Sequence, residues 1–454
     1  MRLRSSLFVQ LLCWAIVLFV SISFTKESET ISETLGQPVD GVRDHIEKAN
    51  QSQAVWFDST WWGCFRSSGG EDIWHIYKLN RDPLNGSSWS EETSLNMSSE
   101  DQVDMHVNPL DSTLFVLFSV QERVFRLSYT ASGWAIDPGF PKSLSIGAGS
   151  NDPASITQAN DGDLFVFSSS GGSLRVNYSS NKGDSWSSFS LGSASSALTD
   201  AIPFFYGTGW NVGVFVGEGS GSLDYTFMRL PDSLAANNSG NWIEEDLPFD
   251  NYPELAADDH VNIVKDADHN LYAMCKLGDG GPTFFILKRD VLADWSVFEV
   301  ESDGGTRPAV SFDGSNKRLY AFARTGGIIQ YVAQHRDSLT NISANDWQPV
   351  LENGSDAFNN VSAPYQILNS ISDLVVLGEN ESRGELWYNT IDIHASNIPQ
   401  YALSVNTSGP GSVSLNPPGG VYDSATVVAL TANAAPGFMF DHWSGDLSGS
   451  TNPT

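Results

Sequence analysis

The chain repeats one order of apolar and polar positions. An extended run is followed by a short Gly/Asp/Asn turn and then by a strongly apolar run, such as LFVLFSV at Leu114 and LYAFART at Leu319. A third run comes next, and a fourth segment opens with a tryptophan after a polar loop. The gaps between these tryptophans are 45, 52, 56, 53 and 52 residues for Trp89, Trp134, Trp186, Trp242, Trp295 and Trp347. Each unit is therefore predicted to be a four-stranded antiparallel sheet of about 50 residues.

Four-stranded units at this period are typical of β-propeller blades. Six tryptophan-marked units follow Ala54, and a seventh runs from about Ala363 to Ile393 without a tryptophan-marked fourth strand. We predict an all-β, seven-bladed β-propeller over residues 54–393, with six blades as the alternative. The missing strand could come from the polar segment 26–53, which would remove an exposed sheet edge. A short helix over 42–49 is the competing interpretation.

The N-terminus places Arg2 and Arg4 before an apolar run from Leu7 to about Ile22. This pattern predicts a secretory signal peptide over residues 1–25, with an uncleaved membrane anchor as the alternative. No later stretch is long and apolar enough to span a bilayer, so we expect the remaining chain to be secreted or at the cell surface.

Charge narrows the choice of partner. The 24 basic and 54 acidic side chains give a formal net charge of −30, which disfavours nucleic acid and, beyond the signal segment, membrane surfaces. A monomer is expected. Beyond the signal segment, the only thiols are Cys64 and Cys275, and both lie in apolar runs. Buried free thiols are favoured over a disulfide.

Two stretches resemble known propellers. Residues 179–186, SSNKGDSW, are similar to the Asp-box S-x-D-x-G-x-T-W of BNR repeats in sialidase-like propellers of secreted bacterial proteins, with Asn181 for Asp and Ser185 for Thr. In that family the box is a structural turn away from the catalytic face, so the resemblance supports the fold. Residues 257–393 look like a group of secreted, BNR-like bacterial propellers.

Residues 401–454 resemble the InlB-type bacterial B-repeat. The resemblance rests on a Y-x-L-x-V opening, an N-P-x-G-G-x-Y turn and a G-F-x-F-x-x-W-S-G-D core. It implies a small β-rich spacer or surface-association module, joined to the propeller by a linker over 394–400. Such modules ordinarily continue with at least one more strand, so we expect this one to be incomplete at its C-terminus.

In a propeller the first strand of each blade lines the central channel, and the loops that precede these strands form one rim where ligands bind. Counting back along each repeat places several polar side chains at or beside this rim. We assign catalytic roles to His260, Asp259 and Arg307. We assign substrate-binding roles to His106, Asp152, Asp200, Asp258, Asn262 and Asn360. The alternative is that these polar groups satisfy one another or channel water.

The residue types suggest carbohydrate chemistry. His260, flanked by Asp258 and Asp259, could act as a general acid or base, and Arg307 offers a planar fork for a carboxylate or sulfate. Such a pair suits lysis of a uronic-acid polysaccharide, and the expected architecture is similar to that of ulvan-type polysaccharide lyases. Hydrolysis by two of the rim aspartates is the neighbouring possibility.

We therefore expect a secreted carbohydrate-active propeller, a lyase or a glycoside hydrolase acting on an acidic polysaccharide. The alternative is a non-catalytic glycan-binding or adhesion propeller of the cell surface. Sialidase activity is disfavoured, because only Thr306-Arg307-Pro308 is reminiscent of the R-I-P motif of that family.

Aromatic residues and metal ligands add less. Tyr206, Trp210 and Tyr252 could stack on sugar faces, whereas Trp61 and Trp62 are expected in the core between blades. No cofactor is expected. Residues 266–270, DADHN, are rich in oxygen ligands but lie where the repeat requires a turn, so a turn is favoured over a calcium site.

Overall fold

The protein was analysed as a computed structural model, in which the following residues are described: 16–23, 35–43, 46, 48, 50–69, 72–82, 86–147, 153–194, 197–218, 225–249, 252, 257–278, 283–393, 400–416, 420–423 and 428–453. The chain divides into two compact units, Met1–Glu29 with Ser396–Thr454, and Thr30–Ala395. Within these described ranges, no helix has the length and apolar character needed to cross a bilayer. The expected signal peptide lies outside the described residues except for strand β1 (Ile16–Ser23).

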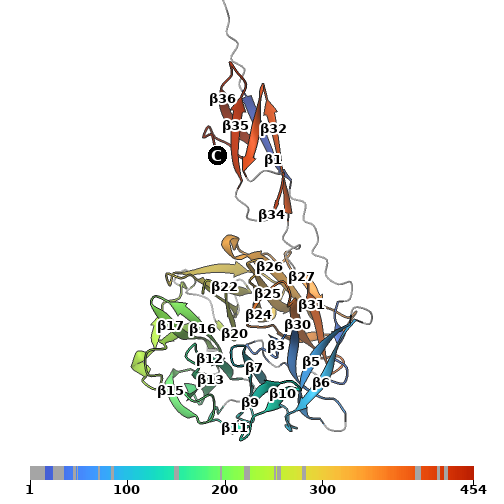
Figure 1. Cartoon of the computed structure of the whole chain (residues 1–454), viewed down its shortest axis with the longest axis vertical. Helices are drawn as coiled ribbons and strands as arrows, with labels where there is room; N and C mark the ends of the chain where they lie inside the picture. The colour runs from blue at the N-terminus through green and yellow to red at the C-terminus, as the bar shows by residue number, and fades with distance from the viewer. Residues whose placement is uncertain are drawn as a thin grey trace, which may run out of the picture. The chain divides into compact units, whose positions relative to one another are not determined.

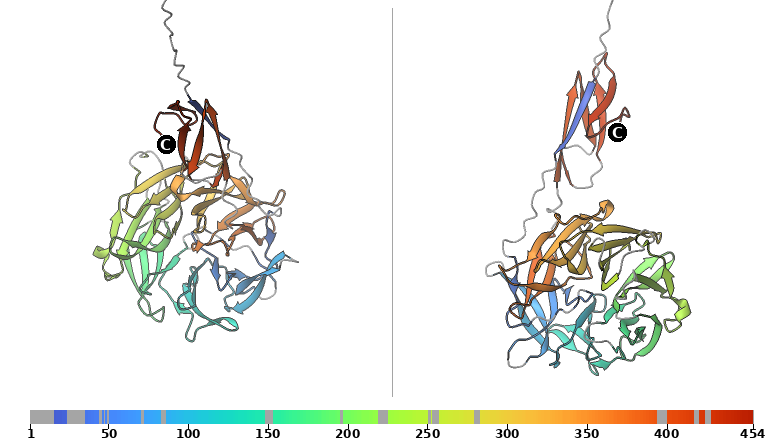
Figure 2. Two further views of the ribbon diagram at one scale, coloured as in Figure 1. Left: turned by 45° about the horizontal axis from the view of Figure 1, so that its top comes forward. Right: turned by 180° about the vertical axis from the view of Figure 1, so that it is seen from behind.

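The larger unit consists of seven blades arranged around a central axis (Figures 1 and 2), as the seven-bladed prediction requires. From the axis outward, blade 1 contains β3 (Ala54–Phe57), β4 (Thr60–Arg66), β5 (Trp74–Asp82) and β6 (Gly86–Ser94). Blade 2 contains β7 (Val103–Asn108), β8 (Thr113–Phe118), β9 (Arg123–Thr130) and β10 (Gly133–Ile136), and β11 (Lys142–Ser143) also pairs with β9. Blade 3 contains β12 (Ser155–Gln158), β13 (Leu164–Ser170), β14 (Ser173–Ser179) and β15 (Ser187–Ser193).

The remaining blades follow the same antiparallel order. Blade 4 contains β16 (Ala197–Tyr206), β17 (Gly209–Glu218), β18 (Tyr225–Pro231) and β19 (Ile243–Glu245). Blade 5 contains β20 (Ala257–Lys265), β21 (Leu271–Leu277), β22 (Phe284–Arg289) and β23 (Trp295–Val300). Blade 6 contains β24 (Thr306–Asp313), β25 (Arg318–Thr325), β26 (Ile328–His335) and β27 (Gln348–Leu351), with β29 (Ile367–Leu368) parallel to β24. Blade 7 contains β28 (Phe358–Ser362), β30 (Leu374–Asn380), β31 (Glu385–Ile391) and β2 (Gln37–Pro38).

The tryptophans that define the repeat lie at the fourth strands. Trp295 opens β23, and Trp242 directly precedes β19. The indole of Trp242 packs edge-on against Phe167 of the preceding blade, with 5.8 Å between ring centroids. The repeat in the sequence therefore reflects one packing role, which is to fill the outer part of the gap between two blades.

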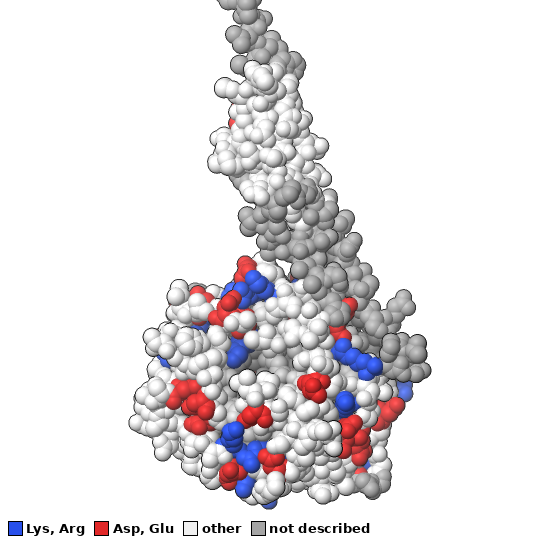
Figure 3. Space-filling view, viewed as in Figure 1, with Lys and Arg blue, Asp and Glu red and all other residues white. Residues whose placement is uncertain are grey.

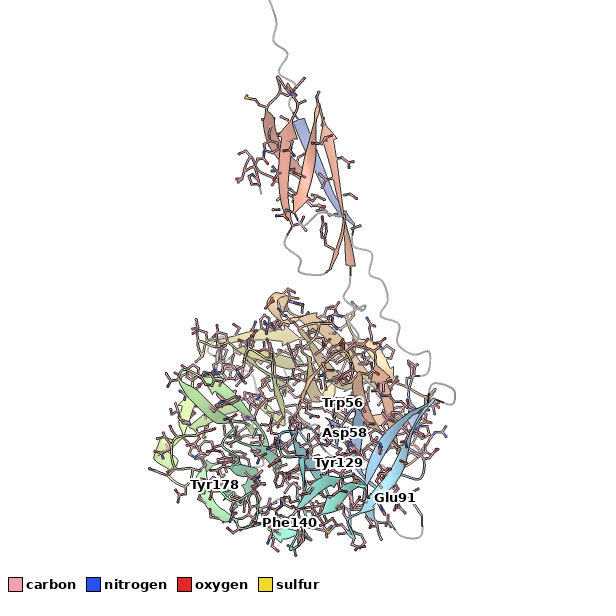
Figure 4. All side chains as sticks on the ribbon, viewed as in Figure 1. Trp56, Asp58, Glu91, Tyr129, Phe140 and Tyr178 are labelled. Atoms are coloured by element: carbon pink, nitrogen blue, oxygen red, sulfur yellow. The ribbon has the colours of Figure 1, made fainter. Side chains whose placement is uncertain are left out.

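The hydrophobic core lies between neighbouring blades. Each adjacent pair of blades shares a cluster of buried side chains, as Val55 and Trp62 of blade 1 do with Val103 and Val116 of blade 2. Because both faces of an inner strand are covered, its sequence is continuously apolar rather than alternating. Polar contacts add to this packing on the face seen in Figure 4, where the Tyr129 hydroxyl donates to Asp58 across blades 1 and 2 at 2.7 Å.

The two cysteines of the larger unit, Cys64 and Cys275, are buried free thiols, which confirms the prediction. Their burial raises the pKa of both thiols well above the ordinary range. Trp61 and Trp62 are also fully buried, in the core between blades.

A ring of buried polar contacts ties the inner strands together. Asp104 of blade 2 accepts from Ser52 N in the segment leading into blade 1 and from Ile156 N of blade 3, both at 2.8 Å. Further contacts around the ring join Ser155 to Thr199, Asp200 to Ile263 N, Asn262 to Val310 N, Ser311 to Pro364 O and Ser362 to Gln51 O. At every step around the ring, a side-chain hydrogen bond therefore joins an inner strand to the next inner strand or to the residues that directly flank it.

The N-terminal segment of this unit joins the two ends of the ring. Gln37 and Pro38 pair with Tyr388 and Trp387 of β31 and so supply the outermost strand of blade 7. The chain then reaches the hub, where Asn50 Nδ2 donates to Thr199 O of blade 4 at 2.9 Å. The backbone N–H of Ile46 donates to Glu379 of blade 7, and Asn50 and Gln51 are both buried, so the described residues of this segment extend across the rim end of the channel from blade 7 to blade 4.

The smaller unit is a separate β-rich body. Its strands are β1, β32 (Gln400–Ser408), β33 (Gly411–Asn416), β34 (Val421–Asp423), β35 (Ala429–Ala434) and β36 (Phe440–Gly445). The apolar run in β1 lies between β32, to which it is antiparallel, and β36, to which it is parallel. Trp443 is the buried centre of its small core, and its Nε1 donates to Thr451 O at 2.8 Å.

Candidate functional site

Blades 5, 6 and 7 share an irregularity at the rim end of their first strands. The pairing register shifts between Ala257 and Val261 in β20, between Thr306 and Ala309 in β24, and between Phe358 and Val361 in β28. The first strands of blades 1 to 4 pair with their neighbours in unbroken register over the described residues. A bulge turns side chains out of the regular alternation, and bulges are frequent beside active sites.

The sequence explains the bulge in blade 6. Pro308 has no backbone N–H, so it cannot contribute to a regular strand ladder. Arg307, directly before it, has a φ of 59°, in the left-handed region that a non-glycine side chain adopts at a cost. Backbone strain of this kind is often found at functional sites.

The bulges in blades 5 and 6 bring Asp258, His260 and Arg307 together. Nη1 of Arg307 donates to Nε2 of His260, and the opposite ring nitrogen, Nδ1, contacts the Asp258 carboxylate. Because a guanidinium only donates, Nε2 must be the accepting nitrogen and Nδ1 must carry the proton. The arrangement therefore holds a neutral imidazole with its basic nitrogen facing a cation.

Two further residues complete the cluster. The ammonium group of Lys276, at the end of β21, pairs with the other oxygen of Asp258. The Tyr225 hydroxyl, from β18 of blade 4, donates to the backbone carbonyl of Asp258 at 2.6 Å. Blades 4 and 5 thus fix the position of Asp258, and Asp258 in turn fixes His260, which Arg307 of blade 6 contacts from the other side of the imidazole.

Exposure differs within the cluster. His260 is 5% exposed, while the side chains of Asp258 and Lys276 are 27% and 21% exposed. Arg307 is half-buried, and among the described residues its Nε has no hydrogen-bond partner. The solvent-facing part of the cluster is thus formed by Arg307, Lys276 and Asp258, with the imidazole beneath them.

Asn360 lies in the bulge of blade 7. It is buried, and its Nδ2 donates to Glu379 of β30, whose other oxygen accepts from the backbone N–H of Ile46. This contact joins blade 7 to the segment that crosses the channel, and no described contact links Asn360 to the cluster around His260.

Asp200 and Asn262 lie deeper along the axis than His260. Both belong to the ring of contacts between inner strands, where Asn262 Nδ2 donates to Asp200 Oδ2 at 2.9 Å. Burial raises the pKa of Asp200 well above its ordinary range, and the neighbouring carboxylate of Asp104 raises it further. The hydrogen bonds of both side chains described above thus connect inner strands to one another.

His106 has other neighbours than His260. It stacks on Tyr365, with ring centroids 5.2 Å apart, in the part of the channel toward which Lys265 extends. Burial, together with the charge of Lys265, lowers the pKa of His106 to about 3. The HVN motif shared by residues 106–108 and 260–262 therefore does not give the two histidines the same surroundings.

Two of the assigned residues cannot be placed. Asp152 lies outside the described residues, and so does the side chain of Asp259. Lys276 and Tyr225 are members of the cluster that the sequence did not single out. Their positions in the repeat could have indicated them. In an antiparallel blade, the end of the second strand and the start of the third lie at the same rim as the start of the first strand.

Metal ligands are not gathered in the described part of the chain, where no group of three or more His, Cys, Asp or Glu side chains could hold an ion. In the turn 266–270, Asp266 Oδ1 accepts from the backbone N–H groups of Asp268 and Asn270, both at 2.9 Å. Its other oxygen accepts from Tyr272 at 3.0 Å, so both oxygens are engaged by the protein.

The C-terminal part of the smaller unit matches a known family by its sequence. Residues 401–454 match the family model described as the divergent InlB B-repeat domain. Residues 401–454, which we call the B-repeat module below, contain no Lys or Arg. On the propeller, by contrast, acidic and basic side chains gather in small mixed groups, as the face in Figure 3 shows.

Comparisons of the whole chain give only distant similarities. No curated protein matches it. Among solved structures, an ulvan lyase of polysaccharide lyase family PL25 is 10% identical with a TM-score of 0.49, covering 80% of this chain and 96% of that one. The lectin SapL1 in complex with α-methyl fucoside is 11% identical with a TM-score of 0.43, covering 69% and 97%. Likenesses at this distance carry no argument about what this chain binds.

Proposed function

We propose that the propeller is a lyase that cleaves a uronic-acid-containing polysaccharide at the cluster of Asp258, His260 and Arg307. The observation that supports this proposal is the chain of contacts from the Asp258 carboxylate through the imidazole to the guanidinium. It places a neutral base beside a cation that can bind a carboxylate. Those are the two groups that elimination from a uronate needs.

The proposed step begins when Arg307 exchanges its imidazole partner for the substrate carboxylate. The ion pair neutralises the carboxylate charge and so makes the hydrogen on the adjacent carbon, C5, more acidic. The exchange also releases Nε2 of His260 from Arg307. Nε2 then takes the proton from C5, and the electrons of that C–H bond form the C4=C5 double bond as the C4–O bond breaks. The departing oxygen takes a proton from water. Asp258 stabilises the imidazolium formed in this step.

The residues around the cluster have supporting roles in this proposal. Lys276 adds a second cation at the solvent-facing side, suited to a sulfate or a second carboxylate on the same glycan. The unpartnered Nε–H of Arg307 would donate to a bound carboxylate, which would satisfy a donor that is costly to leave unpaired when buried. Asp259, the residue before His260 in the chain, is proposed to add its negative charge to that of Asp258 when the imidazolium forms.

A second candidate function is non-catalytic glycan binding. It is favoured by Asn50 and Gln51, which are buried at the rim end of the channel and donate to Thr199 O and Ala154 O, so that the chain itself covers part of the channel mouth. A binding protein needs no access to Nε2 of His260, whereas a lyase does.

One assay separates the two candidates. The purified protein would be incubated with uronate-containing and neutral polysaccharides, and ultraviolet absorbance and reducing ends would be followed together. A lyase produces an unsaturated, absorbing end with each cut, a hydrolase produces reducing ends without absorbance, and a binding protein produces neither but is retained on the immobilised glycan. Retention without absorbance would contradict the lyase proposal.

The cellular setting belongs to the same proposal. We infer that the N-terminal apolar segment directs export, that the chain acts as a secreted or surface-held monomer, and that the B-repeat module serves as a spacer or surface-association module. The turn 179–186, in which Asn181 Oδ1 accepts from Ser185 N at 3.0 Å and Trp186 donates to Gly183 O at 3.0 Å, is proposed to be a divergent Asp-box.

A further inference from the structure

A second group of sugar-compatible side chains lies at the opposite end of strand β20. From Asp258 the strand runs seven residues to Lys265, a distance of at most about 23 Å in an extended chain. Lys265 directly precedes the turn between the first and second strands of blade 5. The corresponding hairpin of blade 4 pairs Phe205 with Trp210 and lies beside it.

The surroundings of the Lys265 ammonium group are aromatic and uncharged. Its Nζ donates to the backbone carbonyl of Pro203 and lies 5.6 Å from the ring centroid of Trp210. Two imidazoles also lie close enough for the ammonium to affect them, those of His106 and His269. Burial and the charge of Lys265 lower the pKa of both, so neither adds a charge near neutral pH.

Lys265 has no ion-pair partner in the described part of the chain. Two carboxylates belong to the adjacent turn, but Asp266 and Asp268 both pair with Arg336. Burial lowers the pKa of Lys265 to about 8, which reflects the cost of holding a cation with no anion beside it. Because the chain has 54 acidic and only 24 basic side chains, a buried ammonium group without a carboxylate partner is unusual in it.

The adjoining rings supply the other half of a sugar site. Trp210 contacts His269 and Phe205, at centroid distances of 4.9 and 5.9 Å, and Phe205 is 40% exposed. Exposed aromatic rings pack against the apolar C–H faces of sugars, while an ammonium binds a carboxylate or sulfate. We propose that Lys265, Trp210, Phe205 and His269 form a second site, which binds an anionic sugar residue at the face of the propeller opposite to His260.

This site is independent of the chemistry proposed at His260. A site at each face would let one propeller hold two segments of an acidic glycan, which increases retention through effective concentration rather than through new contacts at the cleavage point. It also explains why the predicted sugar-stacking residue Trp210 does not lie at the rim.

The test measures chemical labelling of Lys265. The full chain is treated with an acetylating reagent at pH 8, and acetylation of each lysine is followed by mass spectrometry with sodium glucuronate, glucose or sodium sulfate present. The same measurement on Arg307→Ala removes the site at the rim. Lys182, an exposed lysine that pairs with Asp111 and belongs to neither proposed site, serves as the internal reference. Phe205→Ala and Trp210→Ala remove the stacking surface, and their thermal midpoints report folding.

Glucuronate is expected to slow acetylation of Lys265 at least threefold in both the wild type and Arg307→Ala, while glucose has no effect. Phe205→Ala should weaken this protection without unfolding the protein, which keeps the test valid if Trp210→Ala does not fold. The proposal is overturned if glucuronate leaves the rate at Lys265 unchanged, if glucose protects equally, or if protection disappears in Arg307→Ala. Equal protection by sulfate that survives both aromatic variants would show an anion site without sugar recognition and would also overturn it.

Discussion

Arg307 of blade 6 hydrogen-bonds His260 of blade 5 across 47 positions of the chain. Each residue lies in a bulge at the start of its own inner strand, and the two bulges face one another only because the blades are packed side by side. The proposed catalytic arrangement is therefore a property of the interface between two blades. Substitutions that change one bulge should alter the site without disturbing either sheet.

His260→Ala is predicted to reduce turnover of a uronate polysaccharide by about 10²-fold or more, the usual contribution of a positioned acid or base. The thermal midpoint should change little, because the contacts of this imidazole with Asp258 and Arg307 belong to the cluster and not to the ring that joins the inner strands. Initial rates of ultraviolet absorbance and a thermal melt measure the two effects.

The matched control for this variant is His75→Ala. His75 is buried to the same degree and also contacts a carboxylate, with Nδ1 2.9 Å from Glu91, but it lies in blade 1 away from the cluster. It should lose comparable stability and keep its activity. Full activity in His260→Ala, or equal loss of activity in both variants, would refute the role given to His260.

The strained backbone of Arg307 makes a second prediction. Glycine adopts a φ of 59° without penalty, whereas alanine keeps the strain. Arg307→Gly should therefore be more stable than Arg307→Ala, by about 1 kcal/mol. Both variants should lose affinity for an acidic glycan equally, because both remove the guanidinium.

Denaturant unfolding and glycan binding, measured side by side, test this pair of variants. If Arg307→Ala proved the more stable of the two, the backbone at this position would not be strained as the structure has it. If either variant kept the affinity of the wild type, the guanidinium would not be what holds the glycan.

The sequence predicted the blades well because each blade has its own local signal. Alternating runs, turns and one tryptophan recur in every unit except the last, and this periodicity suffices to count seven. The rim was predicted less completely, because bulges shift the register by a residue or two. His260 therefore contacts Arg307, whereas Asn262, two residues further along the same strand, accepts from Val310 N of the next inner strand.

Contacts between distant parts of the chain left no comparable signal. Nothing local to Lys276 or Tyr225 shows that they meet at Asp258, since this depends on how blades 4 and 5 pack. In the same way, the isolation of Lys265 follows from the pairing of Asp266 with Arg336, 70 positions away. Residue type and spacing predict where a side chain starts, whereas neighbouring blades determine what it contacts.

The segment that supplies β2 is predicted to stabilise the ring. A chain that begins at Asp44 would lose the pairing of Gln37 with Tyr388, the hydrogen bond from Val39 N to Leu386 O and the burial of Val39 and Val42. Relative to a chain that begins at Thr30, its unfolding free energy should fall by about 3 to 6 kcal/mol, from the two valines alone.

Starting both chains after residue 29 removes the same part of the smaller unit from each, so the comparison isolates residues 30–43. Loss of β2 also exposes β31 as a sheet edge, and exposed edges pair with other chains. Size-exclusion chromatography should therefore show oligomers only for the shorter chain. Equal stability and equal elution would mean that β2 is not needed to hold the ring closed.

Asp104, a member of the ring of contacts between inner strands, predicts how the stability of the protein depends on pH. Burial raises its pKa from the ordinary value of 3.8 to about 7, so between these values the folded protein binds a proton that the unfolded chain releases. Stability from this group is therefore fully present below about pH 4 and is lost as the pH rises through 7, by up to about 4 kcal/mol. Asp104→Asn removes the titrating group, so the stability of the wild type relative to the variant should be highest at about pH 4, fall as the pH rises to about 7 and stay constant above that. Calorimetric melts of both proteins across this range measure this difference, in which the other titrating groups largely cancel. Parallel profiles would show that Asp104 titrates alike in the folded and unfolded protein.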